Sequence, residues 1–254
     1  MKNLVFPEGN NEFIKTAAEQ LKSICNPILL DGDLNAAVQM VKDGEADVIV
    51  AGIDHSTRDV ILAVRDGIGV AEGQKTFASL FVCDFPDGQR FILSDGGVCK
   101  NPTEQQLADI IILNHFAAQK ILDTTPKIAM LSFSTFGSGG KDPSIDKVAE
   151  AMTIAREKHP EILVDGEMQL DAAVNPRIAA KKSGDSKVAG EANVLITPDL
   201  NSGNILYKSF EQFAHATVAG PILLGFAKPA SDLSRGSTVE DIVLTAKCVL
   251  ALAD

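Results

Sequence analysis

The chain has 254 residues, a formal net charge of −11 and a hydrophobic content of 45%. This length suffices for one large α/β domain or two smaller ones. The excess of carboxylates argues against a nucleic-acid partner, because it repels phosphates, although a few local arginines can still hold a small anion. No apolar run is long enough to cross a bilayer, and four scattered cysteines are typical of buried thiols in a reducing compartment. We therefore expect a cytoplasmic protein with no membrane partner.

Strand and helix patterns alternate near the start of the chain. Short apolar runs, typical of buried strands, lie at Leu4–Phe6, Pro27–Leu30 and Asp47–Gly52. Helical spacing follows each of them, at Glu12–Ile24, Asp33–Lys42 and Thr57–Arg65. This βαβ order predicts a mainly parallel sheet that is covered by helices.

The pattern then changes. Two apolar runs, Ala78–Phe85 and Arg90–Leu93, flank a Pro-Asp-Gly turn and predict an antiparallel pair of strands. Further strands are expected at Lys127–Phe133, Leu163–Asp165, Asn193–Ile196 and Val218–Phe226, the last one broken by Gly220-Pro221. Helices are expected at Thr103–Leu122, Ser144–Lys158, Leu170–Lys182, Asn201–Ala214 and Val239–Leu252.

Four polar loops follow apolar strands. They are Ala51–Arg58, Ser132–Lys141, Thr197–Asn204 and Ser231–Thr238. Ligands of open α/β sheets gather at the carboxyl ends of strands, so these loops are the candidate binding positions.

The second loop is rich in glycine and hydroxyl side chains. Freely exposed N–H groups and hydroxyls suit a phosphate or an acyl phosphate. The loop lacks the glycine, and the Ser or Thr after the lysine, that a nucleotide P-loop requires. A flexible surface connection is the alternative, since Gly–Ser loops are common connectors.

The fourth loop leads into the last helix. Ser234 and Arg235 lie just before the helix start, where the helix dipole and a guanidinium favour an anion. Asp241, in the first turn, is positioned to accept a proton if it faces the same ligand. On the residues alone, capping is the simpler interpretation: Ser237 with Glu240, or Thr238 with Asp241, fits a capping box.

The four histidines show no metal-ligand spacing, and we expect no metal site. His55 lies in the first polar loop, where it can contact a ligand.

Long segments of the second half resemble one family. They are Lys127–Gly139, Val164–Ala173, Val188–Lys208 and Gly220–Val243. Their sequence and order resemble the phosphotransacetylases, the family of phosphate acetyltransferases and phosphate butyryltransferases. The resemblance covers most of the chain after Lys127 and is weaker before it, with anchors at Val50–Asp59 and Leu93–Gly97.

This resemblance implies two α/β domains with a mainly parallel mixed sheet, similar to isocitrate and isopropylmalate dehydrogenases, with the active-site cleft between them. The first domain would comprise residues 1–72 plus 230–254, and the second residues 73–229. The implied reaction is acyl-CoA plus phosphate giving acyl phosphate plus coenzyme A. Coenzyme A is then a substrate and no cofactor is tightly bound. The family also implies a homodimer whose partners are small molecules, without nucleic acid.

The resemblance assigns the catalytic roles to Ser234, Arg235 and Asp241. Asp241 would take the thiol proton, Ser234 would bond near the developing oxyanion, and Arg235 would hold the phosphate. The substrate-binding residues implied by the loops and the resemblance are Ser134, Thr135, Gly137, Ser138, Asn201, Asn204, Lys208, His55, Ser56 and Arg58.

The chain departs from the family in its first half, where a region between about Asp31 and Asp47 is shorter. An arginine implicated in coenzyme A binding belongs to that region, and a second family arginine aligns near Leu62, with Arg58 and Arg65 close but out of register. Two alternatives stay open. One is an NAD-dependent hydroxy-acid dehydrogenase on the related fold, against which stands the lack of a dinucleotide fingerprint. The other is a non-catalytic module that binds an acyl phosphate.

Overall fold

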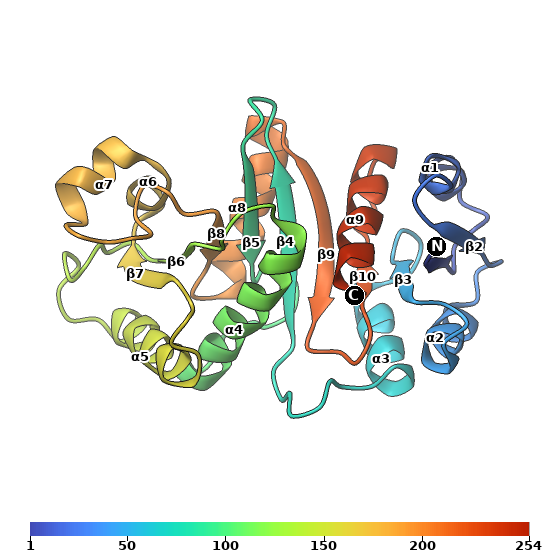
Figure 1. Cartoon of the computed structure of the whole chain (residues 1–254), viewed down its shortest axis with the longest axis horizontal. Coiled ribbons are helices and arrows are strands. Elements are labelled where there is room, and N and C mark those ends of the chain that lie inside the picture. Colours follow the sequence, from blue (N-terminus) through green and yellow to red (C-terminus); the bar gives the residue numbers. More distant parts are fainter. Residues whose placement is uncertain (254) are drawn as a thin grey trace. The chain divides into compact units, whose positions relative to one another are not determined.

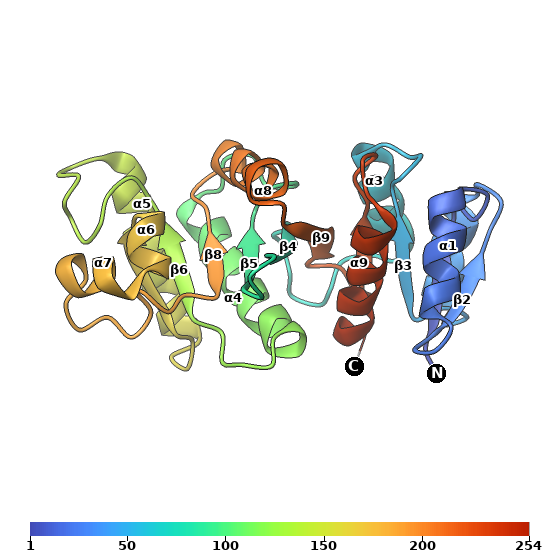
Figure 2. The same cartoon turned by 90° about the horizontal axis from the view of Figure 1, so that it is seen from above.

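The computed structural model describes residues 1–253 and forms two compact units. The first comprises Met1–Val82 and the chain from Thr217 onward, and the second comprises Cys83–Ala216. Figure 1 and Figure 2 show helices alongside the strands in each unit, as the alternating pattern predicts. The α/β class is confirmed. The boundaries expected from the sequence, 1–72 with 230–254 and 73–229, stay a prediction about independently folding domains.

The first unit contains a mainly parallel sheet in the order β2-β1-β3-β10-β9. Its strands are β1 (Asn3–Phe6), β2 (Asn26–Leu29), β3 (Val48–Ala51), β9 (Thr217–Leu224) and β10 (Ala230–Asp232). β1 pairs in parallel with β2 and β3, and β10 pairs in parallel with β3, whereas β10 and β9 are antiparallel. Parallel pairing places the carboxyl ends of β1, β3 and β10 at the same edge, so the loops that follow them come together there.

Four helices complete this unit. They are α1 (Glu12–Leu21), α2 (Leu34–Asp43), α3 (Thr57–Gly67) and α9 (Val239–Leu252). α1 packs against α9, and α2 packs against α3. The helices begin at side-chain caps, with Asn11, Asp33 and Ser56 each accepting a backbone N–H of the first turn.

The second unit has the parallel strand order β5-β8-β6-β7. The strands are β5 (Arg90–Ser94), β6 (Ile128–Leu131), β7 (Val164–Met168) and β8 (Val194–Ile196). The helices are α4 (Glu104–Ile121), α5 (Pro143–Lys158), α6 (Leu170–Val174), α7 (Pro176–Lys182) and α8 (Leu200–Ala214). β4 (Ala78–Asp84) neighbours β5, and the short turn expected between them joins the two, with the Arg90 guanidinium 2.6 Å from the Asp84 carboxylate.

The single helix expected at Leu170–Lys182 was wrong. The structure has two helices, α6 and α7, which meet at Asn175. Pro176 has no N–H to continue the first helix, and the Asn175 side chain accepts the N–H groups of Arg177 and Ile178 at 3.0 and 3.4 Å. Asn175 therefore ends one helix and caps the next.

The expected break in the strand at Gly220-Pro221 was also wrong, because β9 runs through it. The Gly220 N–H donates to Thr245 Oγ1 at 2.9 Å, and the Pro221 carbonyl accepts from Ser231 Oγ at 2.8 Å. Side chains of α9 and β10 thus satisfy the backbone groups that the strand ladder does not. β10 was not expected. Two of its three residues, Ser231 and Asp232, are polar, so the sequence lacks the apolar run typical of a buried strand.

We predict that Thr245→Val destabilises the protein by about 1–3 kcal/mol, because it leaves the buried Gly220 N–H without an acceptor. The change is nearly isosteric, so packing is retained. Thr153→Val is the matched control: Thr153 is an exposed helical threonine whose hydroxyl bonds a backbone carbonyl, and its loss is expected to cost less than about 0.5 kcal/mol. Urea unfolding of both variants measures the difference, and equal stabilities would contradict the prediction.

Candidate functional site

The loops after β3 and β10 touch at Gly52. Gly52 has a φ of +114°, and a Cβ there would lie 2.3 Å from Asp232 Oδ1 and 2.5 Å from the Leu233 N. The Leu233 N–H also donates to the Ala51 carbonyl at 2.5 Å. The absence of a side chain at position 52 therefore allows the loop that carries His55 and the loop that carries Ser234 to pack directly together.

Glu8, which follows β1, organises the loop after β3. Its carboxylate is 3% exposed and accepts the backbone N–H groups of Gly52, Asp54 and His55 at 3.0–3.2 Å. Glu8 Oε1 also lies 2.6 Å from His55 Nδ1. These bonds satisfy a buried carboxylate and fix both the loop backbone and the histidine ring.

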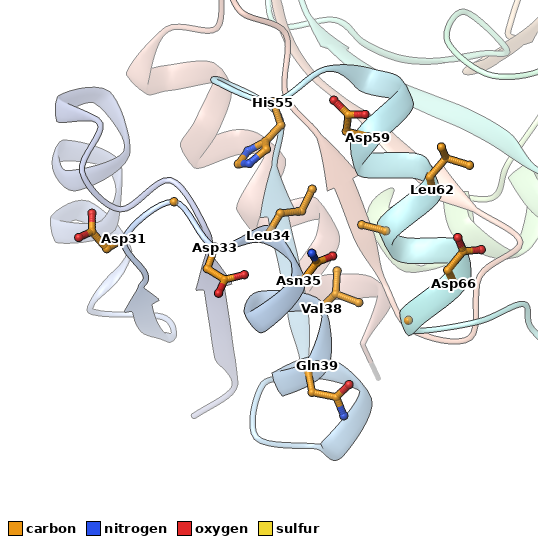
Figure 3. Close-up of a pocket in the computed structure, with 13 residues that line it drawn as sticks. Asp31, Asp33, Leu34, Asn35, Val38, Gln39, His55, Asp59, Leu62 and Asp66 are labelled. Atoms are coloured by element: carbon orange, nitrogen blue, oxygen red, sulfur yellow. The ribbon is translucent and has the colours of Figure 1, made fainter.

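His55 borders a pocket of about 770 Å³ between α2 and α3 (Figure 3). Its side chain is 24% exposed. Figure 3 shows Asn35, Val38 and Gln39 along one side and Asp59, Leu62 and Asp66 along the other. Asp31 and Asp33 also line the pocket. Of these four aspartates, Asp66 is ion-paired with Arg65 at 2.7 Å, so the remaining three give the pocket a negative character.

Asp232 is the last residue of β10 and directly precedes the loop that carries Ser234 and Arg235. It is 1% exposed, and its burial raises the pKa of the carboxyl to about 6, with the charge of Glu8 adding to the rise and the Thr57 hydroxyl and Arg235 opposing it. Among the described residues its Oδ1 finds no hydrogen-bond partner. Asp232 thus lies within electrostatic range of both Glu8 and Arg235.

Ser234 and Arg235 form the turn that leads into α9. Ser234 is half-buried and Arg235 is exposed. The Ser234 carbonyl accepts the Ser237 N–H at 3.0 Å, which closes the turn. Arg235 forms no ion pair with any residue from 1 to 253, and its guanidinium is therefore available to an anionic ligand.

Asp241 caps α9. Its Oδ2 accepts from both the N–H and the hydroxyl of Thr238 at 2.8 Å, and its Oδ1 accepts from the Val218 N–H at 3.2 Å. The Thr238 hydroxyl in turn accepts the Asp241 N–H at 3.2 Å. Of the two capping boxes considered from the sequence, the structure has that of Thr238 with Asp241. Both carboxylate oxygens are occupied, and the role of Asp241 as a proton acceptor stays a prediction.

The predicted phosphate loop of the second unit is closed around Glu167. Glu167 Oε1 accepts from Ser134 Oγ and from the Gly137 N–H, each at 2.7 Å. The Thr135 N–H donates to Ser138 Oγ at 2.9 Å. Ser134 is fully buried, and the loop's backbone N–H groups from 134 to 140 all have acceptors within the protein. A phosphate bound by these groups would have to displace some of these bonds.

The remaining candidates lie on two helices, α3 and α8. Ser56 caps α3 by accepting the Asp59 N–H at 3.2 Å, and Arg58, in the first turn of the same helix, is exposed. On α8, Asn204 donates to the Gly96 carbonyl at 3.1 Å. Asn201 and Lys208 are exposed, and Lys208 Nζ lies 4.8 Å from the centre of the Tyr207 ring.

An apolar pocket of about 470 Å³ lies at the carboxyl ends of β6 and β8 in the second unit. Its lining includes the apolar side chains of Leu131, Phe133, Leu170, Ile205 and Leu206. Residues 1–253 contain no cluster of His, Cys, Asp or Glu that could hold a metal ion. They also contain no helix with the length and apolar character needed to span a membrane.

Comparison with known proteins identifies the family. Residues 31–250 match the family model described as Phosphate acetyl/butaryl transferase. The chain belongs to this family. The phosphate acetyltransferase of Clostridium acetobutylicum is 45% identical over 212 residues, which is 82% of this chain and 63% of that enzyme. The phosphate acetyltransferase of Treponema pallidum is 44% identical over 226 residues, 86% of this chain and 67% of the relative.

Solved structures agree with this assignment. A phosphotransacetylase from Streptococcus pyogenes superimposes with a TM-score of 0.89 at 35% identity, covering 99% of this chain and 94% of that one. A 4-hydroxythreonine-4-phosphate dehydrogenase from Klebsiella pneumoniae has a TM-score of 0.53 at 12% identity over 87% of this chain and 69% of its own, which shows a shared fold alone. The resemblance to phosphotransacetylases is therefore confirmed, and the dehydrogenase alternative is not favoured. The chain spans less than two thirds of the length of the Clostridium relative.

The sequence did not reveal that the carboxylates of Glu8, Asp95, Glu167 and Asp232 are buried. The partners of Glu8 and Glu167 lie far away in the chain: Glu8 and Gly52, whose N–H it accepts, are 44 residues apart, and Glu167 and Ser134 are 33 residues apart. The only local signal is an acidic residue directly after, or inside, a short apolar run.

We predict that Asp232→Asn stabilises the protein at about pH 8 and has no effect near pH 4. A raised pKa means that the folded state binds the proton more tightly than the unfolded state, so the charged carboxylate costs stability above about pH 6. The gain should be about 1–3 kcal/mol at high pH and should fall as the pH drops through about 6. Asp185→Asn, at an exposed aspartate, should show no such dependence. A pH-independent effect of Asp232→Asn on denaturant unfolding would refute the prediction.

Proposed function

We propose that this chain transfers a short acyl group between coenzyme A and inorganic phosphate: acyl-CoA plus phosphate gives acyl phosphate plus coenzyme A. The supporting observation is the Ser234–Arg235 turn. It presents a guanidinium without an ion pair at the start of α9, in a chain that matches the family model over residues 31–250. A phosphoryl group fits this position, because the helix dipole and the guanidinium both favour an anion.

In the direction that makes acyl-CoA, the thiolate of coenzyme A attacks the acyl carbonyl of the acyl phosphate and the phosphate leaves. Arg235 holds the phosphoryl group and stabilises the charge that develops on it, and the Ser234 hydroxyl donates to the developing oxyanion. The protein contributes mainly by orienting the two substrates, and no covalent intermediate with the protein is required. The second-unit candidates Ser134, Thr135, Gly137 and Ser138, together with Asn201, Asn204 and Lys208, are proposed substrate contacts.

Coenzyme A is proposed as a substrate and not as a tightly held cofactor. We further propose a cytoplasmic homodimer whose other partners are small molecules. The scattered cysteines support the reducing compartment, since the thiols of Cys25, Cys83 and Cys248 are buried. Light scattering after size exclusion tests the dimer.

The proposed function is tested by thiol release. Purified protein is mixed with phosphate and with acetyl-, propionyl- or butyryl-CoA, and free thiol is followed over time. We expect phosphate-dependent release with at least one acyl chain, and the ranking identifies the preferred substrate. A protein that binds acyl phosphate but releases no thiol from any acyl-CoA would instead be the non-catalytic module.

We predict that Arg235→Ala lowers turnover by about 100-fold or more, the scale of losing a principal electrostatic stabiliser of the transition state. Arg177→Ala provides the control, because Arg177 is an exposed arginine at the start of a second-unit helix. It should retain normal turnover. Near-normal turnover of folded Arg235→Ala would remove Arg235 from the reaction.

Asp241→Asn separates capping from proton transfer. If Asp241 takes the thiol proton, the variant should keep its melting temperature and lose about 100-fold in rate, because asparagine caps a helix about as well as aspartate does. The two properties are measured on the same preparation. A variant that retains its turnover would leave Asp241 as a cap only.

A further inference from the structure

A buried carboxyl with few hydrogen-bond partners directly precedes the turn that carries Arg235. Asp232 is 1% exposed, and within residues 1–253 its Oδ1 finds no hydrogen-bond partner. The Thr57 hydroxyl bonds the carboxyl, whereas the equally buried Glu8 accepts three backbone N–H groups. An ionised carboxylate that loses its hydration without gaining hydrogen bonds is costly. The charge state of Asp232 therefore depends strongly on the charges around it.

Few charged groups act on Asp232. The strands on either side of β10, which are β3 and β9, contain no charged residue. Of the helices that contact β10, α3 contributes the Thr57 hydroxyl, and on α9 the Asp241 carboxylate caps its own helix. The charges that act on Asp232 are those of Glu8, which opposes its ionisation, and Arg235, which favours it.

An anion bound at Arg235 changes this balance in two ways. It neutralises the guanidinium charge that favours ionisation of Asp232. It also adds a negative charge close to a carboxyl that packs against the Gly52 backbone and has little solvent around it to screen the repulsion. Both changes favour the neutral form of the Asp232 carboxyl.

We propose that Asp232 takes up a proton when an oxyanion, such as phosphate or an acyl phosphate, binds Arg235. This role rests on the placement of the phosphoryl group at Arg235 in the proposed function. The proton comes from the solvent, forms an O–H bond on the carboxyl and returns to the solvent when the anion leaves. No bond of the substrate is made or broken. Because protonation and anion binding favour each other reciprocally, the affinity of the site depends on pH.

The direction of this dependence follows from the state of Asp232 when Arg235 is free. Burial raises the pKa of Asp232 to about 6, so at lower pH the carboxyl is already neutral and the anion meets no repulsion from it. At higher pH the carboxyl must either gain a proton or repel the anion. We expect the affinity to fall about 5-fold or more between about pH 5.5 and about pH 8, the low end of measured couplings between two binding events.

Sulfate is the probe for the test, because it keeps its two charges throughout this pH range. Any proton taken up on binding therefore belongs to the protein. Calorimetric titration at about pH 6.5, in buffers with different heats of ionisation and at constant ionic strength, measures this uptake. We expect the unaltered protein to take up a fraction of a proton. Asp232→Asn should take up none, and at about pH 8 it should bind sulfate about 5-fold or more tightly than the unaltered protein.

Two further variants serve as controls. Asp185→Asn also removes one carboxylate, at an exposed position, and should keep the full proton uptake. Arg235→Ala should lose the sulfate site. A purely structural role of Asp232 would alter stability and leave the proton uptake unchanged.

The outcomes decide as follows. Proton uptake that persists in Asp232→Asn would assign it to another group, such as the Glu8–His55 pair, and would overturn the proposal. Absence of uptake by the unaltered protein, or sulfate binding that does not require Arg235, would also overturn it. If Asp232→Asn does not fold, His55→Asn takes its place, and loss of the uptake there would contradict the role of Asp232. Sulfate binding needs no turnover, so a protein with this uptake but without thiol release would lose only the proposed function.

Discussion

The first unit depends on one buried carboxylate. Glu8 accepts the N–H groups of Gly52, Asp54 and His55, which follow β3 and have no sheet partner. Without this acceptor, the buried Gly52 N–H would lose its hydrogen bond, at a cost of about 1–3 kcal/mol. The loop would then have no fixed position against the turn of Ser234 and Arg235. Glu8 lies outside the loops that carry the polar side chains of the candidate site. It nevertheless fixes the conformation of the loop after β3.

Charge is concentrated unevenly around this contact. Asp232 is buried beside Glu8, so two carboxylates lie in one poorly solvated region, and this raises the pKa of Asp232. Arg235 is the nearby cation, and it lies at the exposed end of the arrangement. An anionic substrate can therefore bind the exposed guanidinium of Arg235, whereas the carboxylates of Glu8 and Asp232 are buried in the protein. In the second unit, Glu167 has a similar role. It accepts hydrogen bonds from the Ser134 hydroxyl and the Gly137 N–H, which are among the donors that suggested a phosphate loop.

Much of the fold follows from local sequence, and most of the site does not. Apolar runs and helical spacing predicted nearly every strand and helix, because period and capping are properties of neighbouring residues. The short strand β10 and the continuous β9 were not foreseen, since Thr245 and Ser231 satisfy their backbone from a distance. Ser234, Arg235 and His55 were identified because they follow strands. The roles of Glu8 and Asp232 were not predicted. The residues next to a carboxylate in the sequence do not reveal which distant N–H groups or charges will contact it in the fold.

The exchange of radiolabelled phosphate into acetyl phosphate tests the central claim most directly. Acyl transfer without a covalent enzyme intermediate requires coenzyme A to carry the acyl group between successive phosphates. Rapid exchange is expected when coenzyme A is present and none when it is omitted. Folded Arg235→Ala should exchange about 100-fold or more slowly than the unaltered protein. An exchange that proceeds equally well without coenzyme A would contradict direct transfer, and no exchange under either condition, with propionyl and butyryl phosphate equally inert, would contradict the proposed activity.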